Sequence, residues 1–207
     1  MNFRLMLKAL FERLRGIFSR SEEARTIDVG FRRATIEDVE SIFDLSVEQA
    51  KAGHLNINLN DPRIVEGLKV QIATAALGMQ VPIQGKRHGA RGTIWVVTLD
   101  GVFAGFATVL EDMPGTWNRH VELYSVGMEA QYRGSGLGRF LVKSVLGELP
   151  GRRIYARCRA PSLAMVHILQ SMDFERTGLS RLGTVTLERK NAWQKERWSV
   201  ARAMKEE

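Results

Sequence analysis

Three glycines lie within five residues in segment 131–139, which reads QYRGSGLGR. Glycines at this spacing let the backbone turn tightly and come close to a ligand. The segment stands between a predicted strand and a predicted helix, so backbone N–H groups and the positive end of the helix dipole would point at that ligand. Arg133 and Arg139 flank the turn. The pattern predicts a site for a phosphate or pyrophosphate, and a turn without a ligand is the alternative.

Two common phosphate motifs do not fit this segment. A nucleotide-binding P-loop needs a lysine followed by serine or threonine after its last glycine, and none follows here. A dinucleotide-binding fold has G-x-G-x-x-G in its first βαβ unit, whereas this chain has G-x-G-x-G after several predicted antiparallel strands. The phosphate site therefore belongs to another fold.

The spacing of apolar residues, together with capping and turn residues, predicts the elements that position the glycine turn. Thr35 followed by Asp38 resembles a capping box, Asp61-Pro62 an N-cap with a first-turn proline, and Asp100-Gly101 a two-residue hairpin turn. Helices are predicted over 35–52, 61–77, from the glycine turn to about 149, and 162–172. Strands are predicted over 30–34, 93–99, 102–110, 121–128, 153–158, 184–188 and 198–204, with a loop over 80–92. This order predicts an α/β (α+β) domain with a mixed sheet.

The glycine segment and the element order together resemble the GNAT superfamily of acyl-CoA-dependent N-acyltransferases. The family signature [RQ]-x-x-G-x-[GA] is filled here by Arg133, Gly136 and Gly138. The resemblance covers roughly residues 30–205. It implies a mixed, mostly antiparallel sheet of six to seven strands with a splayed central strand, flanked by helices. The expected domains are an N-terminal helix with its linker at 1–26 and a GNAT domain at 27–207.

The same resemblance implies a site for acetyl-CoA. The backbone of 133–139 would hold the pyrophosphate, and the strand before it would pair with the pantetheine arm. Ser162 stands where many members have an asparagine that contacts the cofactor or a water. The implied cofactor-binding residues are Val126, Gly127, Met128, Arg133, Gly134, Ser135, Gly136, Leu137, Gly138, Arg139 and Ser162.

Two residues are predicted to carry the proton chemistry. Glu122 lies eleven residues before Arg133, the offset of the general base in histone-acetylating members, and it is predicted to take the proton of the acceptor amine. An ordinary exposed strand carboxylate is the alternative. Leu169 stands where members often have a tyrosine that acts as the general acid and protonates the departing thiolate. Tyr124, expected on the strand face of Glu122, is predicted to replace it, with His167, a water or a purely structural role as alternatives.

The charge of the chain is concentrated at its start. The 207 residues carry a net charge of +7, and residues 1–20, with five basic and one acidic residue, hold +4 of it. Apolar residues recur at helical spacing over 3–18, which predicts a basic amphipathic helix. Docking on the domain or a partner, contact with an anionic membrane, and organelle targeting all remain open for it. With this charge outside the domain, a nucleic-acid partner is not expected.

Composition excludes several further classes. Cys158 is the single cysteine, so no disulfide framework exists, and four scattered histidines predict no metal site. No apolar run is long enough for a membrane span. A cytoplasmic protein is expected, with membrane association through the N-terminal helix and a homodimer left open.

The resulting hypothesis is an N-acetyltransferase that moves acetyl directly from acetyl-CoA to a primary amine of a small molecule, peptide or protein. Ser162 and Leu169 replace two usual functional residues, so a CoA-binding sensor or adaptor with little activity is the alternative. A third interpretation is transfer of a longer acyl chain or use of an acyl-carrier protein.

Overall fold

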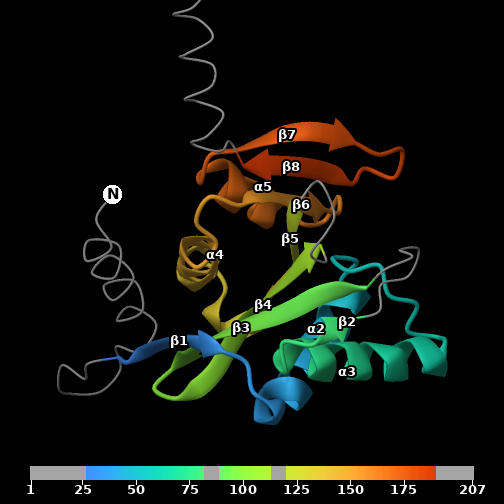
Figure 1. Cartoon of the computed structure of the whole chain (residues 1–207), viewed down its shortest axis with the longest axis vertical. Coiled ribbons are helices and arrows are strands. Elements are labelled where there is room, and N and C mark those ends of the chain that lie inside the picture. The colour runs from blue at the N-terminus through green and yellow to red at the C-terminus, as the bar shows by residue number, and fades with distance from the viewer. Residues whose placement is uncertain (1–26, 82–88, 113–119, 190–207) are drawn as a thin grey trace, which may run out of the picture.

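The structure, a computed structural model, describes residues 27–81, 89–112 and 120–189. One eight-stranded sheet runs through it in the order β1-β3-β4-β5-β6-β8-β7, with β2 beside β3 (Figure 1). Among the described strands, β5 and β6 alone pair in parallel. The strands are β1 Val29–Arg33, β2 Gln80–Val81, β3 Ala90–Leu99, β4 Val102–Asp112, β5 His120–Met128, β6 Arg153–Cys158, β7 Phe174–Leu179 and β8 Val185–Arg189.

Helices cover both faces of the sheet (Figure 1). Those with described residues are η1 Ile36–Asp38, α2 Val39–Lys51, α3 Pro62–Ala76, η2 Ala130–Tyr132, α4 Leu137–Gly147 and α5 Leu163–Gln170. Apolar side chains of α4 and α5 form one core with one sheet face, and those of α2 and α3 form a second core with the opposite face. No described helix has the length and apolar character that crossing a membrane requires.

The predicted fold class is confirmed, with eight strands in place of six to seven. The predicted N-terminal helix at 1–26 lies outside the described residues, as does the strand at 198–204. The division of the chain at residues 26 and 27, the cytoplasmic location and the roles suggested for 3–18 therefore stay predictions.

The predicted turn and cap signals are found where expected. Asp100 (φ 49°) and Gly101 (φ 79°) are both left-handed, as a two-residue hairpin turn between β3 and β4 requires. Asp61 caps α3 by accepting from the Arg63 N–H at 3.0 Å. Thr35 and Asp38 form the capping box, although the first turn it opens is a 3-10 turn that leads into α2.

Asp38 joins this helix start to the sheet. Its carboxylate accepts from the Thr35 N–H at 2.7 Å and from both terminal nitrogens of Arg32 on β1, at 2.7 and 2.9 Å. Burial would raise the pKa of Asp38, but the hydrogen bonds from Arg32 and Thr35 outweigh it and lower the pKa. The ionised form is therefore the one the fold stabilises.

Replacing Asp38 by asparagine should lower the free energy of unfolding by about 2–3 kcal/mol, because charge-assisted bonds in a buried position are lost. Since the folded pKa is depressed, this contribution is present above the unfolded pKa and disappears as pH falls through the folded value. Urea unfolding at several pH values measures it. A difference between wild type and Asp38→Asn that does not shrink at acid pH would contradict the ionic origin.

Two segments differ from the sequence prediction. The predicted loop 80–92 contains β2 and the first residues of β3. Gly92 lies in this segment. A Cβ there would lie 2.5 Å from Val81 and 2.7 Å from Ala75, so this glycine permits close packing inside a strand. The strand β7 was not predicted. A register shift between Arg176 and Gly178 breaks the alternation that would have indicated it.

Candidate functional site

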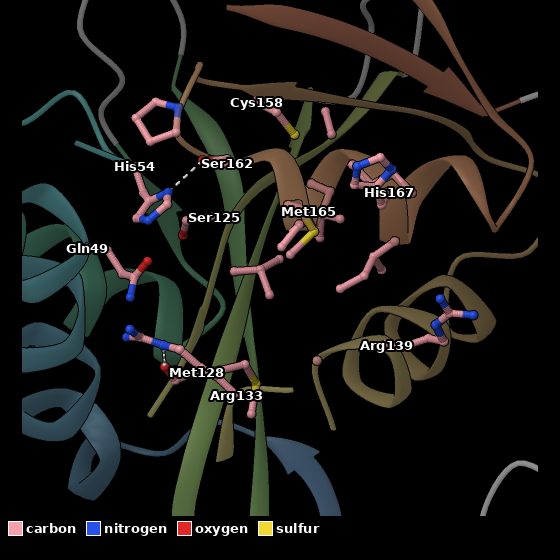
Figure 2. A pocket seen from close by; sticks show the side chains of 18 of the residues that line it. Gln49, His54, Ser125, Met128, Arg133, Arg139, Cys158, Ser162, Met165 and His167 are labelled. Carbon is pink, nitrogen blue, oxygen red and sulfur yellow. Dashed lines mark hydrogen bonds between the residues drawn. The ribbon is translucent and has the colours of Figure 1, made fainter. Parts of the chain in front are cut away.

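The strand β5 separates from β6 halfway along its length. β5 pairs with β4 from Val121 to Met128, but it pairs with β6 only from His120 to Leu123. Beyond Leu123 its edge on the β6 side is therefore free of a strand partner, which is the predicted splay. A cavity of about 490 Å³ lies at this opening, lined by residues of β5, β6, α5, the end of α2 and the glycine turn (Figure 2).

A bulge in β5 coincides with the separation. Leu123 faces Val109 of β4, whereas Ser125 faces Thr108, so Tyr124 is an extra residue with no partner in the β4 ladder. Strict alternation would have placed Tyr124 on the face of Glu122. The bulge interrupts that alternation. Tyr124 lines the cavity and Glu122 does not, while the charge of Glu122 still acts on Tyr124.

The glycine turn forms one end of the cavity. Gly134 (φ 77°) and Gly136 (φ 98°) adopt left-handed conformations, and α4 begins directly afterwards. Gly134, Gly136 and Gly138 all line the cavity. The N-terminus of α4 thus meets the cavity along glycines, so no side chain covers the helix end.

Two predicted binding residues of this turn point elsewhere. The Ser135 hydroxyl donates to the Tyr132 carbonyl at 2.7 Å and accepts from the Leu137 N–H at 3.2 Å. The Ser135 and Leu137 side chains are buried and absent from the cavity wall. Their side chains therefore stabilise the turn, and only their backbone is left for a ligand.

The two arginines of the motif differ in their surroundings. Arg133 donates from Nε to the Met128 carbonyl at 3.0 Å and forms an ion pair with Glu48 of α2, so it ties the end of β5 to a helix. Arg139 lies on the first turn of α4 and also lines the cavity (Figure 2). It makes no ion pair with a carboxylate of the described residues.

The end of β5 contributes alternate residues to the cavity. Val126 and Met128 line it. Gly127 faces the other way, where a Cβ would lie 2.7 Å from Phe106 and 3.2 Å from Leu45. Gly127 therefore lets β5 lie close to α2, and its side-chain position cannot touch a ligand in the cavity.

Glu122 is buried in a polar cluster beside the cavity. One carboxylate oxygen accepts from the Tyr155 hydroxyl at 2.9 Å. The other accepts from Arg157 Nε at 2.8 Å and lies 2.8 Å from a terminal nitrogen of the same guanidinium, as an ion pair. Only 3% of Glu122 is exposed. Both oxygens already have strong partners, so this geometry favours a positioning role over direct contact with a substrate.

Tyr124 interacts electrostatically with the same cluster. Burial raises its pKa, the negative charge of Glu122 raises it further, and Arg157 opposes the effect. The phenol therefore keeps its proton at neutral pH.

Ser162 and His54 meet on the opposite wall. The Ser162 hydroxyl lies 2.9 Å from Nδ1 of His54, and both residues line the cavity (Figure 2). Sequence analysis predicted Ser162 but missed His54. The one available signal was Gly53, the residue before it, which directly follows the predicted helix 35–52.

Comparisons with known proteins agree with this geometry. The model of the acetyltransferase (GNAT) family matches residues 76–174, which include β5, the glycine turn and α5. This part of the chain is similar to the GNAT acetyltransferase family. It is 32% identical over 60 residues to the N-alpha-acetyltransferase RimI of Mycobacterium tuberculosis, a match that covers 29% of this chain and only 38% of that relative.

Solved GNAT structures share the fold. A GCN5-related N-acetyltransferase from Kribbella flavida is 19% identical with a TM-score of 0.59, covering 78% of this chain and 96% of that one. The PaiA N-acetyltransferase from Thermoplasma acidophilum, solved in complex with coenzyme A, is 14% identical with a TM-score of 0.53, covering 79% and 99%. GNAT enzymes take their acetyl group from acetyl-CoA.

Leu169 departs from the usual GNAT pattern. It is fully buried and lines the cavity from α5. A leucine side chain has no proton to donate, so the residue at this position cannot act as the general acid. Tyr124 and His167, the residues predicted from the sequence as alternative general acids, both line the cavity.

Cys158 lines the cavity as an inert thiol. It is 5% exposed, and burial raises its pKa to about 11. Because the thiolate is the reactive form, Cys158 should react with a disulfide reagent at least about tenfold more slowly in the folded protein than after unfolding. Stopped-flow absorbance at mildly alkaline pH measures both rates. Equal rates would show that the cavity exposes an ionised thiol.

Proposed function

We propose that this protein is an acetyl-CoA-dependent N-acetyltransferase that moves the acetyl group directly to a primary amine. The observation that carries the proposal is a single cavity that joins the glycine turn to the free edge of β5. None of the described residues lining this cavity is a carboxylate, whereas Arg133, Arg139 and Arg157 all line it. Such a wall suits a donor that carries several phosphates.

The residues of the glycine turn fit the phosphates of coenzyme A. Backbone N–H groups at the start of α4 lie along glycines, and the helix dipole favours negative charge there. Arg139 adds a cation on the same helix turn. The cavity volume of about 490 Å³ is in the range of cofactor sites. In this proposal Val126, Met128 and Ser162 hold the arm of the donor.

Acetyl-CoA supplies a thioester carbonyl that an amine can attack. The residues of this chain then have three tasks. Backbone N–H groups on the free edge of β5 would stabilise negative charge on the carbonyl oxygen. Tyr124 would give its proton to the departing sulfur, which its raised pKa permits. Glu122 would hold Arg157 and Tyr155 in place beside Tyr124.

The acceptor enters opposite the glycine turn. Gln49, His54 and Leu55 line this side, and they come from the end of α2 and the turn after it. An amine-bearing small molecule, peptide or protein is the proposed acceptor. The likeness to an N-alpha-acetyltransferase makes peptides with a free N-terminal amine the first set to test.

The test combines calorimetry with a thiol-release assay. The full chain should bind coenzyme A, and it should release thiol from acetyl-CoA only when an acceptor amine from a panel of peptides and small amines is present. Mass spectrometry of the product should show one added acetyl group per amine. Failure to bind coenzyme A would overturn the proposal. Tight binding with transfer at the background rate would leave the sensor or adaptor in its place.

A further inference from the structure

His54 and Ser162 form a side-chain pair between elements far apart in the sequence. They are 108 residues apart, and the His54 Nδ1 to Ser162 Oγ distance is 2.9 Å. Both side chains are half-buried, and both line the cavity. In Figure 2 the pair lies across the cavity from Arg139, on the side of Gln49.

The end of α2 places His54 there. The Gly53 N–H donates to Ala50 at 3.0 Å and the His54 N–H donates to Gln49 at 2.9 Å, with Gly53 left-handed at φ 80°. These two bonds are the Schellman ending of a helix, which reverses the chain at its glycine. His54 follows the reversal directly and points back over the cavity (Figure 2).

A second contact holds this turn against the start of α5. Arg159, in the connection between β6 and α5, donates to the Leu55 carbonyl at 2.8 Å. The Gly53 Cβ position would lie 3.5 Å from Pro161 of the same connection. The two chain segments that bear His54 and Ser162 are thus fixed to each other independently of the His54–Ser162 bond.

Ser162 is not used as an ordinary helix cap. It occupies the N-cap position of α5, where a serine hydroxyl commonly accepts from a backbone N–H of the first turn. Its side chain makes no such bond. The hydroxyl meets His54 instead, which leaves a serine and an imidazole joined at a cavity wall.

The cavity offers few other proton acceptors. Its arginines keep their protons, and burial raises the pKa of Tyr124 and of Cys158. Among the described lining residues, His54 and His167 are the ones with an imidazole nitrogen that can accept a proton. His167 lies towards Arg139, at the proposed donor end, and His54 lies at the proposed acceptor end (Figure 2).

The elements around His54 carry several charged or titratable groups that any titration must include. They are Glu48 and Lys51 of α2, Arg133 of the glycine turn, Tyr124 of β5, Arg157 of β6, Arg159 and His167. Arg133 is paired with Glu48, and Arg157 with Glu122.

We infer that the His54–Ser162 pair accepts the proton of the attacking amine, an inference that rests on the proposed acetyltransferase function. The amine lone pair forms the new C–N bond and the C–S bond breaks. The amine proton passes to Ser162 Oγ while the Ser162 hydroxyl proton passes to His54 Nδ1, so the imidazole becomes cationic. The sulfur takes its proton from Tyr124, and both groups return to their starting forms through solvent.

The tautomer of His54 is the first test, and it needs no turnover. In the full chain, ¹⁵N-labelled histidine should show His54, assigned by its loss in His54→Gln, protonated at Nε2 with Nδ1 accepting from Ser162. Ser162→Ala should move the Nδ1 resonance. A neutral His54 protonated at Nδ1 would overturn the inference, because Nδ1 could then take no proton from Ser162.

Kinetics provide the second test. His54→Gln and Ser162→Ala should each lower the single-turnover transfer rate about 100-fold, the double variant should lose no more than either, and the acid limb of the pH profile should vanish. In His54→Gln, affinity for coenzyme A should change by less than about threefold, and the Ser162→Ala rate is compared at saturating acetyl-CoA, which separates the proton role from donor binding. His167→Gln should keep the acid limb, whatever its effect on acetyl-CoA binding.

The outcomes separate the inference from the proposed function. Wild type that binds coenzyme A but transfers acetyl to no amine would sink the proposed function. Wild type that transfers acetyl, together with a His54→Gln variant that keeps the acid limb, would sink this inference alone. Losses that multiply in the double variant would also overturn it, since they would show that the two residues act separately.

Discussion

Replacing Gly138 by aspartate should weaken the binding of coenzyme A by at least about 100-fold while the fold stays intact. Gly138 lines the cavity, and a Cβ there would lie 3.4 Å from Met128 and 3.9 Å from Ile168, which is ordinary contact. The new carboxylate would stand among the backbone N–H groups proposed for the phosphates. A like charge about 4 Å away costs several kcal/mol near a protein surface.

Stability should not follow the loss of binding. Gly138 lies in the first turn of α4, where a carboxylate interacts favourably with the helix dipole. Thermal unfolding should therefore give a midpoint at or above that of wild type, and calorimetry should measure the affinity. At Gly136 the left-handed φ of 98° would strain any side chain, so a loss there could reflect misfolding.

Two matched variants isolate the charge. Gly138→Asn has the same shape without the charge and should lose much less affinity than Gly138→Asp. Gly147→Asp puts the same charge at the far end of α4, where a Cβ meets nothing within 4 Å and the cavity is absent. It should bind as wild type does. Equal losses in Gly138→Asp and Gly138→Asn would show that space, and not phosphate charge, decides binding at the turn.

The glycine turn could be predicted from sequence because it is local. Three glycines, the helix after them and the strand before them are contiguous, so their spacing alone predicts a phosphate site. The same holds for the Asp100-Gly101 hairpin turn and the capping box at Thr35, whose partners lie within a few residues. Family resemblance then extended this local signal to the whole sheet order.

Contacts between distant segments could not be predicted in the same way. Arg133 is part of the motif, but its side chain binds Glu48, 85 residues earlier. His54 meets Ser162 only because the turn after α2 is held against the start of α5. The bulge at Tyr124 depends on the pairing of β5 with β4, so alternation along the sequence could not indicate it.

The positions of Glu122 and Tyr124 suggest different roles for the two residues. Glu122 keeps both carboxylate oxygens bonded to Tyr155 and Arg157, while Tyr124 reaches the cavity. The charge of Glu122 still acts on Tyr124, because it helps to raise the pKa of the phenol. A carboxylate that was predicted as a base thus becomes, in this proposal, the group that keeps an acid protonated.

Replacing Tyr124 by phenylalanine should lower the single-turnover acetyl-transfer rate about 100-fold, because the sulfur loses its proton donor. Coenzyme A affinity and the unfolding midpoint should change little, since the ring is retained and the bulge residue is half-exposed. On the alkaline side the wild-type rate should fall as Tyr124 loses its proton, above the ordinary phenol pKa. That alkaline limb should be absent in Tyr124→Phe.

The position of the alkaline limb separates the two roles of Glu122. In Glu122→Gln one cause of the raised Tyr124 pKa disappears and the opposing charge of Arg157 remains, so the limb should move to lower pH. If Glu122 were instead the base, its replacement would remove the acid limb and leave the alkaline limb in place. An unchanged alkaline limb in Tyr124→Phe would assign the sulfur's proton to another donor. The presence of the alkaline limb in Tyr124→Phe therefore decides whether Tyr124 donates the proton. The direction in which this limb moves in Glu122→Gln decides whether Glu122 controls the pKa of Tyr124.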